Sequence, residues 1–161
     1  AASDVYKRQV YIRMPRKNAQ PVFDKNYKFN LFKADIIEEG TDVTIIATGI
    51  MVAEAKKAVE MLKKDGISAE LISANVIKPL DEKTILESIK KTKHVVTCEN
   101  HNLIGGLYSA VAELVCQRYP LKINGIGVKD RFGQVGKYND LLKEYQMTPQ
   151  DIYYIVKNSL D

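Results

Sequence analysis

The sequence predicts an α/β fold, a three-layer α/β/α arrangement around a mostly parallel, twisted sheet. Two observations carry this prediction. Strand-like apolar runs alternate with helix-like segments from residue 42 to residue 128, and alternating strands and helices form parallel sheets through right-handed crossovers. The apolar runs also lack regular polar alternation, which indicates strands buried on both faces.

The first strand and helix show the pattern most clearly. Residues 42–49 read Asp-Val-Thr-Ile-Ile-Ala-Thr-Gly, a run typical of a buried strand. A helix is expected at residues 51–64, ended by Gly66. The apolar residues that form one face of this helix are Val52, Ala55, Val59 and Leu62. Further strands are expected at residues 69–74, 95–98 and 123–128.

Capping signals place the later helices. Asp81 is expected to cap a helix that carries Thr84, Ile85 and Ile89. Another helix follows Gly105-Gly106 and runs through Val111, Leu114 and Val115. Two helices, at about residues 137–145 and 149–160, end the chain, and Thr148-Pro149 supplies an N-cap and a first-turn proline for the last one.

The N-terminal part carries weaker signals. We expect residues 1–9 to be a non-native leader, because they are small and polar without periodicity. A strand-like run at residues 10–12 leads into a turn at Pro15. Residues 18–40 are expected to connect this part to the sheet, with one short strand near Phe29–Phe32.

Composition excludes several classes of protein. The 161 residues suit one domain, and a net charge of +4 without a concentrated basic stripe argues against a nucleic-acid binder. No apolar run is long enough for a membrane span, so we expect a cytoplasmic protein with no membrane partner. Cys98 and Cys116 lie in apolar contexts and are both expected to be buried free thiols.

Five short segments occur in a characteristic order. They are Tyr-Ile-Arg-Met-Pro-Arg at 11–16, Gly-Thr-Asp-Val-Thr-Ile-Ile-Ala-Thr-Gly at 40–49, Ile-Lys-Pro-Leu-Asp at 77–81, Glu-Asn-His-Asn-Leu-Ile-Gly-Gly at 99–106 and Asp-Arg-Phe-Gly-Gln-Val-Gly at 130–136. Together they resemble the C-terminal third of the transketolase family. Each motif alone is weak, but their order and spacing are specific. The resemblance spans about residues 10–161.

The resemblance implies a part of an enzyme that transfers two-carbon ketol units between sugar phosphates in carbohydrate metabolism, in the pentose phosphate pathway. Such enzymes use thiamine diphosphate and Mg²⁺, held between two other domains across a dimer interface. By this resemblance, residues 10–38 end the pyrimidine-binding domain, and residues 39–161 form the C-terminal domain. The metal-diphosphate signature, a Gly-Asp-Gly followed by Asn, does not occur in this sequence, so we expect this fragment to bind no cofactor and to be inactive alone.

Arg16 is the sharpest candidate for a site residue. The resemblance implies that it binds the phosphate of the sugar substrate, and a guanidinium suits this role because its planar fork offers two parallel donors. Arg13 is the competing position and is expected to be structural.

The other candidates are expected to serve structure or interfaces. Glu99 and His101 are expected in a loop after the third strand, where α/β folds place ligands, but no third metal ligand accompanies them. A hydrogen-bonded loop at a domain or subunit interface is therefore favoured for both. Gly105 and Gly106 resemble an anion cradle at a helix N-terminus, yet a tight turn with close helix–sheet packing is the preferred interpretation. Tyr108 stands where the resemblance predicts a small residue.

Three functions stay open. The first is the C-terminal portion of a transketolase, as one subunit of a split enzyme or part of a longer chain, which packs against the N-terminal and pyrimidine-binding parts in a homodimer or heterotetramer. The second is the corresponding portion of 1-deoxy-D-xylulose-5-phosphate synthase, although Lys17 and His101 favour transketolase. The third is a non-catalytic protein-interaction module of the same fold.

Overall fold

The computed structural model describes residues 11–12 and 20–160. The expected leader at residues 1–9, as well as Arg13 and Arg16, lie outside these described residues. Within them, Tyr11 and Ile12 carry no strand pairing.

A single five-stranded sheet forms the centre of the domain. Its strands are β1 (Asp35–Glu38), β2 (Val43–Ala47), β3 (Ala69–Ser73), β4 (Val95–Asn102) and β5 (Ile123–Val128). Their order across the sheet is β1-β3-β2-β4-β5. Only β1 runs antiparallel to its neighbour, β3, and the other pairs are parallel. The mostly parallel sheet predicted from the alternation of strands and helices is confirmed.

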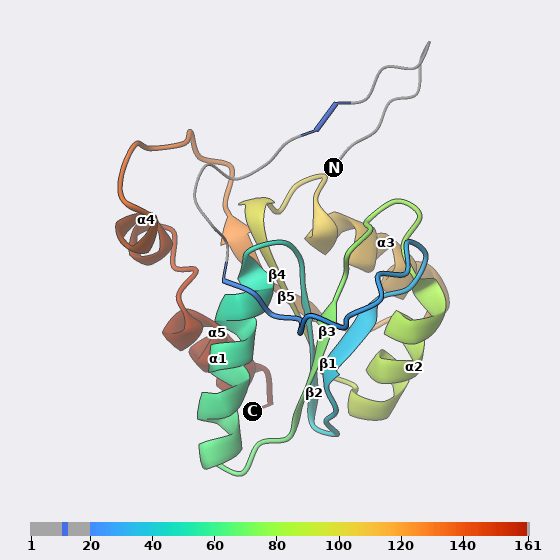
Figure 1. Cartoon of the computed structure of the whole chain (residues 1–161). Helices are drawn as coiled ribbons and strands as arrows, with labels where there is room; N and C mark the ends of the chain where they lie inside the picture. The colour runs from blue at the N-terminus through green and yellow to red at the C-terminus, as the bar shows by residue number, and fades with distance from the viewer. Residues whose placement is uncertain (1–10, 13–19, 161) are drawn as a thin grey trace.

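Helices cover both faces of this sheet (Figure 1). They are α1 (Met51–Lys64), α2 (Glu82–Thr92), α3 (Leu107–Arg118), α4 (Tyr138–Glu144) and α5 (Pro149–Leu160). One apolar core lies between the sheet and α1, α4 and α5, and a second lies between the sheet and α2 and α3. The three-layer arrangement predicted from the sequence is therefore present.

Strand β2 shows why its sequence carries no polar alternation. All five of its residues are buried. Val43, Ile45 and Ala47 face the core under α1, whereas Ile46 faces the core under α2 and α3. Because both faces are covered, both sets of side chains must be apolar or hydrogen-bonded.

The limits predicted for helices α1 and α5 are confirmed. Helix α1 spans the predicted residues 51–64, and α5 spans 149–160. At the start of α5, the Asp151 N–H donates to Thr148 Oγ1 at 3.3 Å, and the Thr148 N–H donates to Asp151 Oδ2 at 2.9 Å. This reciprocal cap confirms the role predicted for Thr148.

The expected position of the first short strand and the expected burial of Cys116 are wrong. The short strand lies at Asp35–Glu38 and not at Phe29–Phe32, where the Asn30 side chain accepts from the Phe32 N–H at 3.1 Å and bends the backbone into a turn. Cys98 is buried as expected, but Cys116 is exposed, because it lies off the buried stripe of α3.

The segment before β1 is tied to the sheet by partly buried polar contacts. Tyr27 Oη donates to Asp35 Oδ2 at 2.5 Å, and the Asn75 side-chain amide donates to the same carboxylate. Burial, reinforced by Asp35, raises the pKa of Tyr27 to about 12. The Ala34 N–H donates to Asp81 Oδ2 at 3.0 Å, so this segment is also joined to the start of α2.

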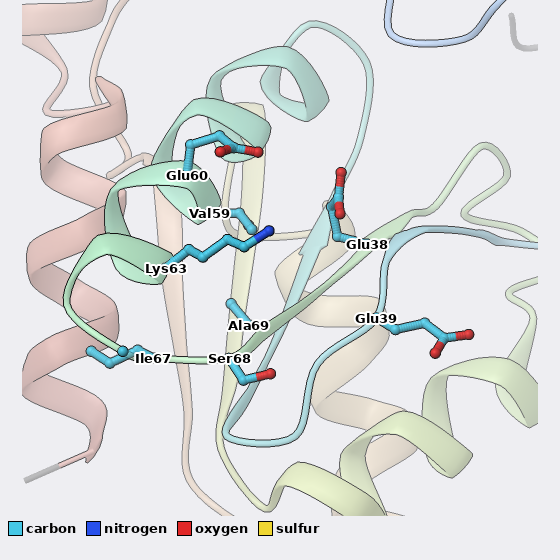
Figure 2. A pocket seen from close by; sticks show the side chains of 9 residues that line it. Glu38, Glu39, Val59, Glu60, Lys63, Ile67, Ser68 and Ala69 are labelled. Carbon is cyan, nitrogen blue, oxygen red and sulfur yellow. The ribbon is translucent and has the colours of Figure 1, made fainter.

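A charged groove lies at the amino end of the parallel strands (Figure 2). It has a volume of about 320 Å³ and is open to solvent. Its wall comes from the end of β1, the last turns of α1 and the start of β3, including Glu38, Glu60 and Lys63. Ligands of open α/β sheets bind at the opposite, carboxyl end of the strands, so this groove is not the favoured position for a site.

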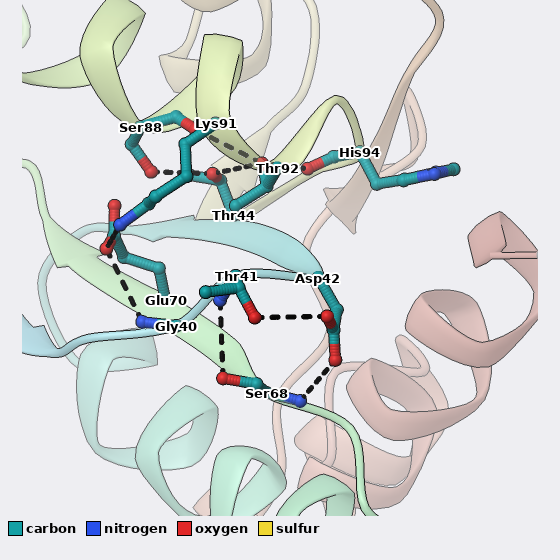
Figure 3. A network of polar contacts seen from close by, with 10 residues as sticks. All are labelled: Gly40, Thr41, Asp42, Thr44, Ser68, Glu70, Ser88, Lys91, Thr92 and His94. Atoms are coloured by element: carbon teal, nitrogen blue, oxygen red, sulfur yellow. Dashed lines mark hydrogen bonds and ion pairs between the residues drawn. The ribbon is translucent and has the colours of Figure 1, made fainter.

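Hydroxyl groups and one ion pair hold α2 against the sheet (Figure 3). Thr44 Oγ1 lies 2.6 Å from Ser88 Oγ and 2.7 Å from Thr92 Oγ1, and all three residues are buried. Lys91 pairs with the buried carboxylate of Glu70. These contacts satisfy polar groups that would be costly to bury alone, and they fix how α2 sits over β2 and β3.

Candidate functional site

The carboxyl end of β4 is organised around one buried carboxylate. Glu99 is only 2% exposed, and its two oxygens accept the N–H groups of Leu107 at 3.0 Å and Tyr108 at 2.8 Å. These are the first two residues of α3, whose N-cap residue, Gly106, has no side chain to cap the helix. Glu99 therefore caps α3 from the neighbouring strand, and its charge lies where the helix dipole favours an anion.

Gly106 is required by this close approach. A Cβ at this position would lie 1.9 Å from Glu99 Oε2 and 2.6 Å from the Asn102 carbonyl oxygen. The glycine thus leaves room for the carboxylate to reach the helix N-terminus. The anion cradle suggested by Gly105-Gly106 exists, but the chain's own side chain fills it.

Burial sets the protonation of the groups around β4. It raises the pKa of Glu99, against the opposing effects of the Tyr108 and Leu107 N–H groups and of His101. Burial, together with the charge of Glu99, also raises the pKa of the Cys98 thiol. A thiol in this environment stays protonated and is a poor nucleophile.

His101 does not join Glu99 in a shared site. It is exposed, and its Nδ1 lies 2.9 Å from the Asn100 carbonyl oxygen. Both residues lie within β4 and not in a loop after it, because the strand continues to Asn102 past an irregularity that follows Cys98. The structure brings Glu99 together with Gly106 and leaves His101 at the surface.

Tyr108 is accommodated by a second glycine. A Cβ on Gly125 in β5 would lie 2.6 Å from Cδ2 of the Tyr108 ring. The larger side chain on α3 is thus matched by the absence of one on the strand beneath it. This explains how the helix packs closely although a small residue is expected at position 108.

An exposed apolar loop lies next to this edge, and the sequence analysis did not single it out as a site. In the connection between β5 and α4, Phe132 is 99% exposed and Val135 is fully exposed. Ile104, in the turn before α3, is 72% exposed. The signal available in the sequence was that Phe132 and Val135 are each next to a glycine and outside any strand or helix pattern. These two exposed apolar side chains, three residues apart on one loop, make the loop a candidate interaction surface.

Possible metal ligands are scattered in the part of the chain that the structure describes. Among residues 11–12 and 20–160, no three His, Cys, Asp or Glu side chains gather to hold a metal ion. The N-terminus of α3, which suits a phosphate group, is taken by Glu99. In this same part of the chain, each helix is too short or too polar to cross a membrane.

Comparison with known proteins identifies the family. Residues 32–152 match the family model described as "Transketolase, C-terminal domain". A 6-deoxy-6-sulfo-D-fructose transketolase subunit from a Clostridium species is 46% identical over 143 residues, which cover 89% of this chain and 44% of the relative. A putative transketolase C-terminal section from Methanocaldococcus jannaschii is 44% identical over 151 residues, which cover 91% of this chain and 46% of the relative.

A third relative and two solved structures complete the comparison. A 1-deoxy-D-xylulose-5-phosphate synthase from Heliobacterium modesticaldum is 32% identical over 130 residues, which cover 80% of this chain and 20% of the relative. A solved structure described as "Split gene transketolase, inactive beta4 tetramer" superposes with a TM-score of 0.86 at 39% identity, covering 90% of this chain and 48% of the other. A transketolase variant from Pichia stipitis, at 20% identity and a TM-score of 0.58, covers 79% of this chain and 18% of its own, and shares the fold.

These matches agree with the order of strands and the layers described above. The chain spans less than half of the length of the two transketolase relatives that it matches. The chain belongs to the transketolase family and corresponds to its C-terminal domain.

Proposed function

We propose that this chain is the C-terminal portion of a transketolase that transfers two-carbon ketol units between sugar phosphates. The observation that carries the proposal is the pair of relatives at 46% and 44% identity, one named as a transketolase subunit and the other as a transketolase C-terminal section. The match to a split-gene transketolase structure adds support for a subunit of the split type. The proposed enzyme is cytoplasmic and works in the pentose phosphate pathway.

In this proposal the domain supports catalysis by packing. The complete enzyme uses thiamine diphosphate and Mg²⁺, which supply the carbanion chemistry of ketol transfer. By the resemblance to the transketolase family, the cofactor belongs to the N-terminal and pyrimidine-binding parts, in the same or a separate chain. The complete assembly is a homodimer or a heterotetramer.

Substrate contact is proposed for Arg16, which follows the strand-like run at residues 10–12 within the segment 10–38, with Arg13 as the alternative position. In the complete enzyme, Arg16→Ala should raise the Michaelis constant for phosphorylated sugars and spare unphosphorylated ones, because the guanidinium binds only the phosphate. The same result for Arg13→Ala, with no effect of Arg16→Ala, would assign the phosphate contact to the alternative position. An equal effect of Arg16→Ala on both kinds of sugar would remove Arg16 from the site.

One alternative has its own support. The Heliobacterium relative at 32% identity is a 1-deoxy-D-xylulose-5-phosphate synthase, and the corresponding portion of such an enzyme is the second candidate function. The lower identity and the smaller share of this chain that is covered favour transketolase. Assays of the complete enzyme for ketol transfer and for formation of 1-deoxy-D-xylulose 5-phosphate separate the two.

Calorimetry tests the proposal as a whole. This chain alone should bind neither thiamine diphosphate nor Mg²⁺. The same chain with its native upstream sequence, mixed with a cofactor-binding transketolase chain, should bind both and transfer ketol units. Tight binding of thiamine diphosphate by this chain alone would refute the proposal that the cofactor is bound by other parts of the enzyme. A folded chain without affinity for cofactor-bearing partners would favour a free-standing interaction module.

A further inference from the structure

The connection between β5 and α4 keeps its shape through polar contacts and leaves its two apolar side chains in solvent. Tyr145 Oη donates to the Phe132 carbonyl oxygen at 3.0 Å and accepts the Gln134 N–H at 3.0 Å. The backbone on both sides of Gly133 is thereby fixed without any contact from the Phe132 ring. The loop does not need its apolar side chains for its own shape.

A second set of contacts holds the start of the loop. Arg131 Nη2 pairs with Glu144 Oε1 at 2.6 Å, and the Arg131 guanidinium lies 4.8 Å from the centre of the Tyr145 ring. Asp130 is instead near the Asn102 side-chain amide, at 3.4 Å. A loop that is ordered before binding loses less conformational entropy when a partner covers it. The arrangement suits a docking element better than a flexible connection.

The position of the loop suggests which part of a complete protein could pack against it. The loop extends beyond the carboxyl ends of β4 and β5, the end of the molecule toward which the N-terminal residues 11–12 also lie (Figure 1). Tyr11 and Ile12 are exposed apolar residues as well. The two transketolase relatives are more than twice as long as the matched part, and the matched family model is their C-terminal domain. A preceding part of the protein would be tethered at this end and held there at high effective concentration.

We propose that Phe132 and Val135 form the docking site for the part of the same polypeptide that precedes this chain in its transketolase relatives. The inference rests on the proposed function. Exposed Lys129 and Lys137 flank the loop, so the complementary surface is an apolar recess with acidic groups at its rim. Burial of the two side chains supplies the affinity, and the flanking charges orient the contact.

Thiol labelling tests this site in the protein with its native upstream sequence. Val135→Cys places a thiol on the loop at a fully exposed position, where the substitution leaves the fold intact. The exposed Cys116 on α3 is an internal reference, and the buried Cys98 does not react. Tyr154→Cys, at an exposed apolar position on α5, is the matched control variant.

In this chain alone, the thiols at positions 135, 154 and 116 should react with a maleimide at similar rates. With the upstream sequence present, labelling at position 135 should slow by roughly tenfold or more, while labelling at 154 and 116 stays unchanged. Adding Phe132→Ser should restore fast labelling at position 135, because the docked contact is weakened. Slowing at position 135 should not depend on protein concentration.

Three results would overturn the proposal. They are equal labelling with and without the upstream sequence, slowing by the same factor at positions 135 and 154, and protection in this chain alone that grows with concentration, which would assign the surface to a second copy. Ketol transfer is measured on the same samples after a cofactor-binding transketolase chain has been added. Protection of the thiol at position 135 without ketol transfer would refute the proposed function but support the docking site. Ketol transfer with an unprotected thiol would support the proposed function and refute the docking site.

Discussion

Replacing Glu99 with alanine tests whether the buried carboxylate holds α3 on the sheet. The change leaves the Leu107 and Tyr108 N–H groups without their acceptor, and an unpartnered buried N–H costs about 1–3 kcal/mol. It also removes an anion from the helix N-terminus, which contributes about 0.3–1 kcal/mol. Relief of a buried charge offsets part of this loss, so we expect the free energy of unfolding to fall by roughly 3 kcal/mol.

Thermal and urea unfolding followed by circular dichroism measure this effect. For a chain of 161 residues, 3 kcal/mol corresponds to a fall in Tm of about 6–12 °C. Glu113→Ala is the matched control, because Glu113 is an exposed glutamate on the same helix and its loss should change stability by less than about 0.5 kcal/mol. Equal effects of the two substitutions would refute the capping role of Glu99.

A double-mutant cycle isolates the contact between Glu99 and Gly106. Gly106→Ala places a Cβ 1.9 Å from Glu99 Oε2 in the native protein, and this clash disappears once Glu99 is alanine. The contact with the Asn102 carbonyl oxygen remains in both backgrounds. Gly106→Ala should therefore cost about 1–2 kcal/mol less in the Glu99→Ala background. Additive costs would show that the glycine is not there for the carboxylate.

The pKa of Glu99 adds a pH dependence with a defined sign. Because burial raises this pKa above its ordinary 4.5 in the folded state, the folded protein binds a proton more tightly than the unfolded chain. The contribution of Glu99 to stability is therefore complete below 4.5 and declines as the pH rises through the raised value. The stability gap between the native protein and Glu99→Ala should narrow over that interval, and a gap that widens with pH would contradict this assignment.

Two further predictions concern α2 and β5. Burial alone would raise the pKa of Asp81, but hydrogen bonds from Thr84 and from the Ala34 N–H outweigh it and lower this pKa below 3.8. The stabilising effect of Asp81 is therefore present above pH 3.8 and is lost as the pH falls through the lowered pKa. Asp81→Ala should lower the free energy of unfolding by about 1–2 kcal/mol at neutral pH. Asp81→Asn should keep most of the helix cap but remove the dependence of stability on acid pH. Urea unfolding from neutral pH down to about pH 2.5, which spans the titration of carboxylates, checks both variants. Gly125→Ala should destabilise the protein by about 1–3 kcal/mol through overpacking against Tyr108, and Tyr108→Ala should relieve most of this cost; an undiminished cost in the double variant, measured by thermal unfolding, would contradict the matched-size explanation.

Local sequence patterns were sufficient to predict the helices whose buried residues recur at regular spacing. The limits of α1 and α5 follow from apolar spacing and from caps that lie within the same segment. The spacing also contained the information needed for Cys116. The buried positions of α3 are Leu107, Val111, Leu114 and Val115, and residue 116 lies outside that stripe.

Features that depend on distant partners could not be predicted in this way. Strand β1 is short and lies at the edge, and its place is set by antiparallel pairing with β3. Phe29–Phe32 has strand-forming residues but is bent by the Asn30 turn. Glu99 and Gly106 were each noted from the sequence, yet their contact depends on how β4 and α3 meet, which no spacing reveals. The ion pair between Arg131 and Glu144 depends in the same way on how the loop meets α4.

The filled N-terminus of α3 has a consequence for how this architecture evolves. In many α/β proteins the same helix end is an open socket for a phosphate group. Here the socket carries a permanent internal plug, the Glu99 carboxylate. The helix end that other α/β proteins offer to a ligand is thus part of this domain's own structure, and it is occupied whether or not a ligand is present.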